Sequence, residues 1–114
     1  MRDPAERLHD MLEAITAIER HQDGDKAAFE RDELCQAWFL RHLQIVGEAA
    51  RALPAEVRKL APEIPWPKII GMRNVLVHGY FDIDTDIVWQ AVTNDVPLLK
   101  PAILNLLARV ESGP

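Results

Sequence analysis

The sequence predicts an all-α fold, an antiparallel bundle of four to five helices that forms a single domain over residues 1–114. Apolar side chains recur at the three- and four-residue spacing of a buried helix face along most of the chain. No segment alternates apolar and polar residues as a half-buried strand does. Hydrophobic residues make up 48% of the chain and aromatic residues only 6%, so aliphatic side chains must fill most of the core.

The first half of the chain contains signals for two long helices. Asp3 is a candidate N-cap, Pro4 suits a first turn, and Glu6 stands where a capping box places its carboxylate. Residues 22–25 should end this first helix. A second helix is expected from about residues 25–29 to Leu53, with a short helical piece after Pro54. Helical spacing in these segments joins Leu8, Leu12 and Ile15, and then Phe29, Leu34, Trp38, Leu43, Val46 and Ala50.

The second half begins with a proline-rich linker over residues 62–67. Pro67 can occupy the first turn of a helix that runs to about Val77, and Gly79 is the expected stop. Residues 82–86 supply acidic caps for a last helix. Pro97 and Pro101 interrupt that helix, so we expect a kink or a short break near residues 95–97.

The overall charge and the single cysteine limit the classes of function. A net charge of −5 argues against a general polyanion binder, although it allows a local basic pocket. Cys35 has no cysteine to pair with, and we expect a buried free thiol in a reducing compartment. The N-terminal residues lack the apolar segment of a signal peptide, and no run approaches membrane-spanning length. These observations predict a cytoplasmic protein.

The stretch Arg73-Asn74-Val75-Leu76-Val77-His78-Gly79-Tyr80 contains the side chains best suited to chemistry. We call this stretch the motif. A histidine can take the proton from a ribose 2′-hydroxyl, which then attacks the adjacent phosphorus. An arginine can hold the phosphate by paired hydrogen bonds. The motif therefore suits RNA cleavage without a metal ion.

The spacing inside the motif indicates a site at a helix end. On one regular helix, Arg73 and His78 would lie about 140° apart around the axis. If the helix ends at about Val77, His78 falls in the turn at Gly79 and can swing back toward Arg73. One histidine per chain supplies a base but no separate acid, so we expect two copies to form a composite site at a homodimer interface.

Taken one at a time, the same residues have ordinary structural explanations. A histidine beside a helix-ending glycine often caps the helix or hydrogen-bonds a neighbour. Arg73 alone would more often form a surface ion pair, and Tyr80 alone would more often be half-buried packing. Spacing by itself does not decide between these explanations and a catalytic site.

Longer stretches of the sequence carry a resemblance to a known family. They are Ile45-Val46-Gly47-Glu48-Ala49-Ala50, Ile64 to Asn74, Tyr80 to Trp89, and Asn94-Asp95-Val96-Pro97-Leu98-Leu99. Together with the motif they resemble the HepT-like toxin ribonucleases of the HEPN superfamily, over nearly the whole chain. The resemblance implies a HEPN-type bundle that forms a homodimer with both motifs lining a cleft.

The resemblance also implies roles for the motif residues. Arg73 and His78 match the family's catalytic pair, and Asn74 matches a polar residue that positions substrate. Tyr80 resembles the tyrosine to which a minimal nucleotidyltransferase antitoxin attaches AMP, as in type VII toxin–antitoxin systems. A bulky anionic adduct there would occupy the phosphate site and repel RNA.

Other features are compatible with more than one explanation. Gly47 predicts a close helix approach, such as one at a dimer interface. Glu48 and Arg51 either position Arg73 or form helix-surface pairs, and the surface pairs are the favoured alternative. Trp38 and Trp89 are expected as core or interface residues, and Trp66 as the residue that packs the linker. A basic rim has as candidates Arg41, His42, Arg51, Arg58, Lys59 and Lys68.

Two negative expectations and two rival functions complete the prediction. The histidines show no metal-ligand spacing and no glycine-rich phosphate loop exists, so we expect neither a metal nor a cofactor. The alternative to a ribonuclease is a non-catalytic helical module that binds a nucleotide or the nucleotidyltransferase partner. A purely structural subunit is a third possibility.

Overall fold

The computed structural model describes residues 3–77 and 84–112, with the backbone alone for residues 74–77. Every element in these ranges is a helix, which confirms the all-α prediction. The chain measures 48 × 27 × 23 Å along its principal axes. No described helix is long and apolar enough to cross a membrane.

Helix α1 (Pro4–Glu19) begins as its sequence predicts. The Asp3 side chain accepts a hydrogen bond from the Ala5 backbone N–H at 2.9 Å, and Pro4 occupies the first turn. The buried face of this helix consists of Leu8, Met11, Ala14, Ile15, Ala17 and Ile18.

The second predicted helix is two helices, α2 (Lys26–Glu30) and α3 (Glu33–Ala52). The prediction of one continuous helix is wrong at Asp32, whose backbone is extended and whose side chain accepts a hydrogen bond from Cys35 N–H at 3.0 Å. An aspartate that caps a new helix start competes with continuation of the old one. The break turns Leu34 outward, with 85% of its surface exposed.

Pro54 precedes the short helix α4 (Ala55–Arg58), as expected. The proline-rich linker then leads into α5 (Trp66–Val77), with Pro67 in the first turn. Trp66 is buried, and its indole N–H lies 3.0 Å from the backbone carbonyls of both Arg58 and Ala61. The prediction that Trp66 packs the linker onto the bundle is confirmed.

The last part of the chain continues from α6 (Thr85–Gln90) through a π-helical stretch, η1 (Ala91–Asp95), into α7 (Val96–Ser112). The predicted irregularity near Pro97 therefore takes the form of a π-helical stretch and not of a loop. Proline at position 97 has no N–H to donate in the helical ladder, and a wider π turn is one way to accommodate such a defect.

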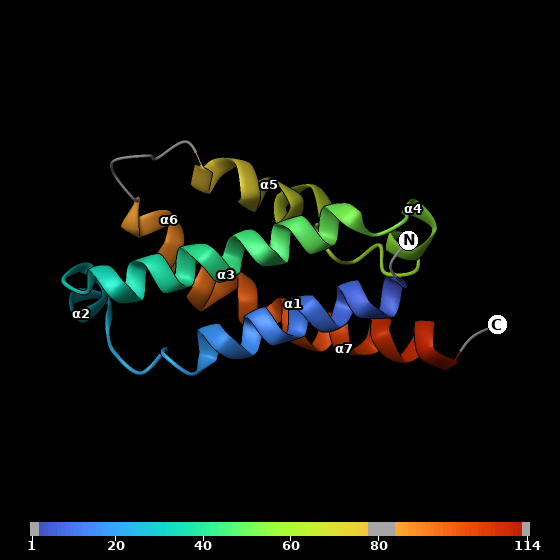
Figure 1. Cartoon of the computed structure of the whole chain (residues 1–114), viewed down its shortest axis with the longest axis horizontal. Helices are drawn as coiled ribbons and strands as arrows, with labels where there is room; N and C mark the ends of the chain where they lie inside the picture. The colour runs from blue at the N-terminus through green and yellow to red at the C-terminus, as the bar shows by residue number, and fades with distance from the viewer. Residues whose placement is uncertain (1–2, 78–83, 113–114) are drawn as a thin grey trace.

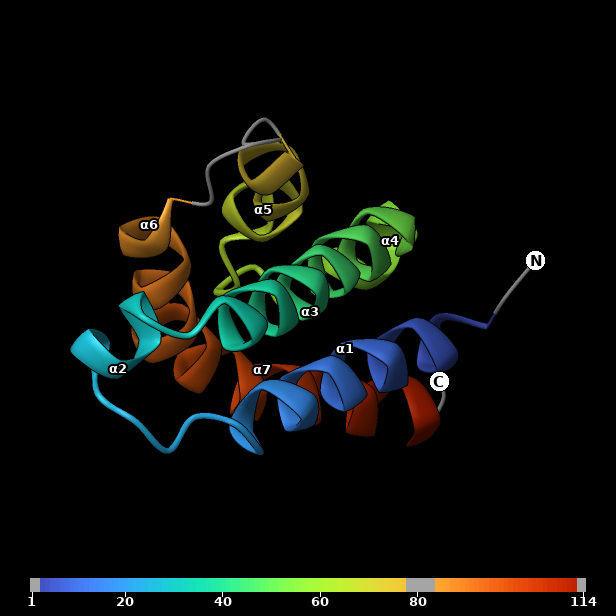
Figure 2. The same ribbon diagram turned by 60° about the vertical axis from the view of Figure 1, so that its left-hand side comes forward.

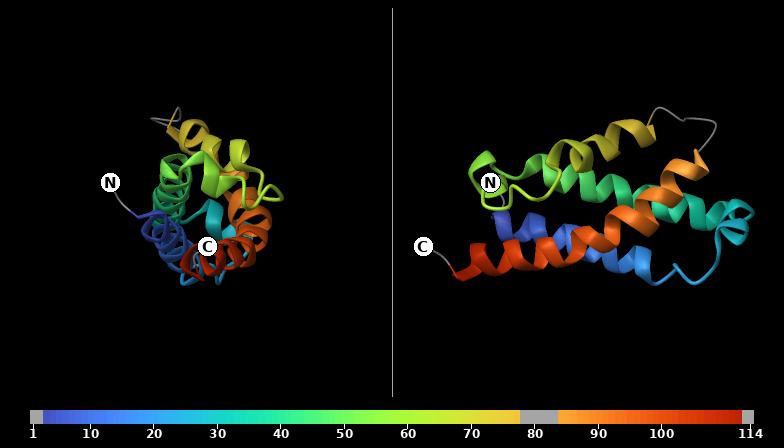
Figure 3. Two further views of the ribbon diagram at one scale, coloured as in Figure 1. Left: turned by 90° about the vertical axis from the view of Figure 1, so that its right-hand side faces the viewer. Right: turned by 180° about the vertical axis from the view of Figure 1, so that it is seen from behind.

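Helix α3 is the central element of the bundle. It packs against α1 on one side and α5 on the other, and α7 covers α1 (Figures 1 and 2). The view down the long axis shows the helices surrounding a shared interior (Figure 3). The largest fully buried side chains come from α1, α3, α5, α6, η1 and α7, and include Leu8, Met11, Ile15, Phe39, Leu43, Val46, Ile69, Val88, Val92, Ile103 and Leu106.

Candidate active site

Arg73 lies on α5 within the last turns before Val77, and its side chain reaches toward α3. Its Nε donates to Oε2 of Glu48 at 2.7 Å. Both side chains are partly accessible, Arg73 at 40% and Glu48 at 55%. The explanation favoured from sequence, that Glu48 forms an ordinary pair along its own helix, is wrong, because Glu48 pairs with the motif arginine on another helix.

Gly47 allows this contact by letting α5 approach α3 closely. A Cβ at this position would lie 3.0 Å from the Arg73 backbone nitrogen and 3.1 Å from the Ile69 carbonyl oxygen. These two atoms belong to the backbone of α5, so they cannot turn aside as a flexible side chain would. The close approach expected at Gly47 therefore occurs, within the chain itself.

A groove of about 500 Å³ lies beside Arg73, between α1, α3 and α5. We call it the arginine groove. It brings together polar side chains that are distant in sequence: Arg7 and Asp10 from α1, Arg41, Gln44 and Glu48 from α3, and Arg73 from α5. Ile45 and Ala49 add apolar surface to its wall.

The other motif residues are only partly covered by the structure. Asn74 lies on α5, with its backbone alone described, and His78 and Tyr80 lie outside the described residues. The described residues therefore include Arg73, the first residue of the motif, and they resume at Asp84, after the motif. The catalytic role of His78 and the modification of Tyr80 stay predictions.

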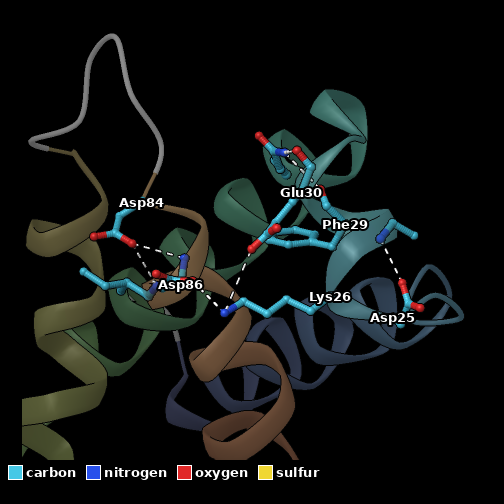
Figure 4. A network of polar contacts seen from close by, with 9 residues as sticks. Asp25, Lys26, Phe29, Glu30, Asp84 and Asp86 are labelled. Carbon is cyan, nitrogen blue, oxygen red and sulfur yellow. Dashed lines mark hydrogen bonds and ion pairs between the residues drawn. The ribbon is translucent and has the colours of Figure 1, made fainter.

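The chain after the motif is fastened to α2 by a polar network (Figure 4). Lys26 Nζ lies 2.7 Å from the Asp86 carboxylate and 4.0 Å from that of Glu30. Asp84 caps α6 by accepting hydrogen bonds from the N–H groups of Asp86 and Ile87, both at 3.1 Å. The contact with Asp86 also raises the pKa of Lys26. The start of α6 is thus held against α2.

The other residues proposed for a basic rim have different environments. Lys68 pairs with Asp95 at 2.9 Å, on the side of α5 toward α7. His42 stacks at a tilt on Trp38 with ring centroids 4.3 Å apart, and its Nδ1 lies 2.7 Å from the Trp38 carbonyl. Arg58 is half-buried, and Arg51 and Lys59 are exposed. Of the six candidates, Arg41 alone lines the arginine groove.

The aromatic and sulfur side chains differ from part of what the sequence suggests. Trp38 is 38% exposed, which excludes the core alternative but not the interface alternative, and its indole N–H donates to the Ala17 carbonyl at 2.8 Å. Cys35 is half-buried and not fully buried. Burial raises the pKa of its thiol, and the carboxylates of Asp32 and Asp23 raise it further.

Sequence reasoning missed Arg7 and Gln44. A signal for Gln44 was present, because Arg41, Gln44 and Glu48 recur at the spacing of one helix face. No local signal places Arg7 beside them, since that contact arises from the packing of α1 on α3. In the described part of the chain, no cluster of three or more His, Cys, Asp or Glu side chains is arranged to hold a metal ion.

Comparison with known proteins identifies the family. The model of the Ribonuclease HepT-like family matches residues 11–106. A protein from Thermococcus cleftensis described as "Probable ribonuclease HepT" is 40% identical over 97 residues, covering 82% of this chain and 86% of that protein. A protein from Methanocaldococcus jannaschii with a provisional RNase designation is 36% identical over 103 residues, covering 90% of this chain and 94% of that protein. No solved structure matched at the same level of significance. The family model matches the chain from within α1 to within α7, and the chain therefore belongs to the HepT-like ribonuclease family.

Proposed function

We propose that the chain is a metal-independent endoribonuclease, the toxin of a type VII toxin–antitoxin pair. The observation that supports this most strongly is the contact between Arg73 and Glu48 beside the arginine groove, in a chain whose family model covers residues 11–106. An arginine held by a carboxylate at the mouth of a groove is suited to receive a phosphate.

In the proposed reaction, Arg73 binds the scissile phosphate. Its contact with Glu48 uses Nε, so the two Nη nitrogens are not required for that contact. They present paired N–H donors that match two phosphate oxygens. Negative charge grows on those oxygens as the nucleophile attacks, so the arginine stabilises the transition state more than the bound substrate.

His78 supplies the proton transfers. It takes the proton from the 2′-hydroxyl, whose oxygen then bonds to phosphorus, and the bond from phosphorus to the 5′-oxygen breaks. His78 of a second copy gives a proton to that leaving oxygen. The products are a 2′,3′-cyclic phosphate and a 5′-hydroxyl. Asn74 would orient the substrate beside this pair.

This division of labour requires a homodimer, because one chain supplies one motif histidine. In a dimer, two motifs facing one cleft would supply a base and an acid. The antitoxin would be a minimal nucleotidyltransferase that transfers AMP from ATP to the Tyr80 hydroxyl and releases pyrophosphate. The adduct would place negative charge next to the phosphate site and thereby exclude RNA.

The test is cleavage of a labelled RNA in EDTA by the wild type and by His78→Ala and Arg73→Ala. We expect a loss of about 10²- to 10⁴-fold for His78→Ala, the usual contribution of a general acid–base residue. Loss of Arg73 should cost about 10²- to 10³-fold, as removal of one oxyanion donor does in other enzymes. Full activity in His78→Ala would contradict the catalytic assignment.

The antitoxin proposal has a separate test. After incubation with the partner nucleotidyltransferase and ATP, the intact mass of the wild type should rise by one AMP, and that of Tyr80→Phe should not. An unchanged wild-type mass would remove the regulatory proposal and leave the nuclease proposal intact. Binding of the partner without RNA cleavage by the unmodified chain would favour the non-catalytic binding module.

A further inference from the structure

The arginine groove collects three arginines in a chain whose net charge is −5. Arg7, Arg41 and Arg73 come from three different helices, and two carboxylates, Asp10 and Glu48, line the same groove. An arginine offers five N–H donors in a fixed plane, a pattern that fits phosphate oxygens. The groove also opens directly beside the arginine assigned to the scissile phosphate.

The three arginines differ in how they are paired. Arg73 is held by Glu48. For the side chains of Arg7 and Arg41, by contrast, the described residues provide neither an ion pair nor a hydrogen bond. Asp10 also lines the groove and takes part in an interaction of its own. Two guanidinium groups are thus left to bind an anion from solution.

The spacing along α3 separates Arg41 from the reacting phosphate. Arg41 precedes Glu48 by two helix turns, about 10 Å along the axis. This separation suits a neighbouring phosphate of the same strand better than the phosphate held at Arg73. Gln44 lies about one helix turn from Arg41 and about one turn from Glu48. Its amide can both donate a hydrogen bond to a ribose or base and accept one from it.

We infer that the arginine groove binds the sugar–phosphate backbone of single-stranded RNA next to the scissile bond, with Arg41 and Arg7 each contacting a flanking phosphate. This inference rests on the proposed ribonuclease function. Contacts to flanking phosphates fix the register of the strand and are made equally in the bound substrate and the transition state. Their loss should therefore raise KM and leave kcat nearly unchanged.

The experiment measures binding separately from cleavage. A single-stranded 2′-O-methyl oligoribonucleotide cannot undergo the 2′-hydroxyl attack, so its affinity can be measured with the active protein. Affinity is followed as a function of salt for the wild type, Arg41→Gln, Arg7→Gln and the matched control Arg31→Gln. Arg31 is an exposed arginine on the α2 side, outside the groove. Cleavage of unmodified RNA in EDTA is measured in parallel.

Each groove variant should bind about tenfold more weakly, the usual cost of a lost hydrogen bond to a charged group. The slope of log affinity against log salt should fall by about 0.7 for each lost phosphate contact with a single strand. Arg41→Lys should restore the slope, since it keeps the charge, and Arg31→Gln should behave as the wild type. These results together support the groove as the RNA path.

Three outcomes would overturn the inference. The groove variants could bind with the wild-type slope, Arg31→Gln could lose as much as they do, or the groove variants could change the oligomeric mass in light scattering instead of the RNA slope. A wild type that binds the oligonucleotide but leaves unmodified RNA intact would overturn the proposed function alone, and the comparison of slopes would still decide the groove.

Discussion

The pairing of Arg73 with Glu48 links a side chain with a proposed catalytic role to a residue whose role the sequence leaves undecided. Both groups are substantially exposed, so the pair adds little to the stability of the fold, about 0 to 1 kcal/mol. Its consequence for the direction of the guanidinium is larger, because phosphate recognition depends on geometry. The contact is better explained by positioning than by stability.

Replacement of Glu48 should separate these two effects. Glu48→Ala is expected to change the unfolding free energy by less than about 1 kcal/mol. It should lower kcat for RNA cleavage by about tenfold or more, because a freed arginine samples unproductive rotamers. Glu48→Gln, which can still accept a hydrogen bond, should recover part of the loss. Unchanged kcat in Glu48→Ala, measured with confirmed folding, would remove the positioning role.

Cys35 should be an unreactive thiol despite its place near the start of α3. A helix N-terminus favours the thiolate, but burial and the carboxylates of Asp32 and Asp23 raise the pKa. A raised pKa leaves a smaller thiolate fraction at pH 8. Alkylation by iodoacetamide should therefore be slower than for glutathione at that pH, and should speed up as the pH rises.

Asp32→Asn provides the control for the thiol prediction. Asparagine keeps the capping ability of position 32 but removes its charge. The variant should react faster than the wild type at the same pH. Equal rates for wild type, Asp32→Asn and glutathione would show that the environment of Cys35 does not suppress its reactivity.

At the scale of elements, two glycines in helices have opposite surroundings. Gly47 on α3 faces the backbone of α5, whereas a Cβ at Gly71 on α5 would meet, among the described residues, no atom within 4 Å beyond its own stretch of helix. Alanine in a helix is favoured over glycine by about 1 kcal/mol. Only Gly71 can gain this amount without a cost from packing.

We therefore expect Gly71→Ala to raise the unfolding free energy by about 1 kcal/mol. Gly47→Ala should lower it, because the new methyl group pushes α5 away from α3. The same displacement would move Arg73 from Glu48, so Gly47→Ala should also reduce cleavage. Chemical denaturation of both variants tests the pair, and a stabilised Gly47→Ala would show that the two helices are free to separate.

Much of the architecture follows from local signals in the sequence. Asp3 with Pro4, Pro54 and Pro67 each set a helix start where expected. The break at Asp32 was missed because apolar side chains continue at helical spacing on both sides of it. The prediction gave more weight to helical periodicity than to one capping residue, and in the structure that residue starts a new helix, α3.

The site was less predictable than the fold, since it depends on contacts between helices. The sequence identified Arg73 and suggested that Gly47 marks a close approach. It left the role of Glu48 undecided, and it did not place Arg7 near α3. These relations arise when α1 and α5 pack on opposite sides of α3, and no local pattern encodes them.

At the scale of the whole molecule, the proposed division of acid and base between two histidines requires two copies of the chain. Light scattering should give twice the mass of one chain. Mixing unfolded wild type with an excess of unfolded His78→Ala and refolding them together should yield mixed dimers with one intact histidine. If the base and the acid come from two chains, the activity per wild-type chain should fall as the excess of His78→Ala grows. A constant activity per wild-type chain would indicate that each chain forms its own site.

In the proposed function, RNA is cleaved by attack of its own 2′-hydroxyl, with Arg73 and His78 and without a metal ion. The most direct measurement is the chemistry of the product ends after cleavage of a defined RNA in EDTA. The expected products have 2′,3′-cyclic phosphate and 5′-hydroxyl ends, and no cleavage is expected at a nucleotide whose 2′-hydroxyl is replaced by hydrogen. Products with 5′-phosphate ends, or cleavage at the deoxy position, would contradict it.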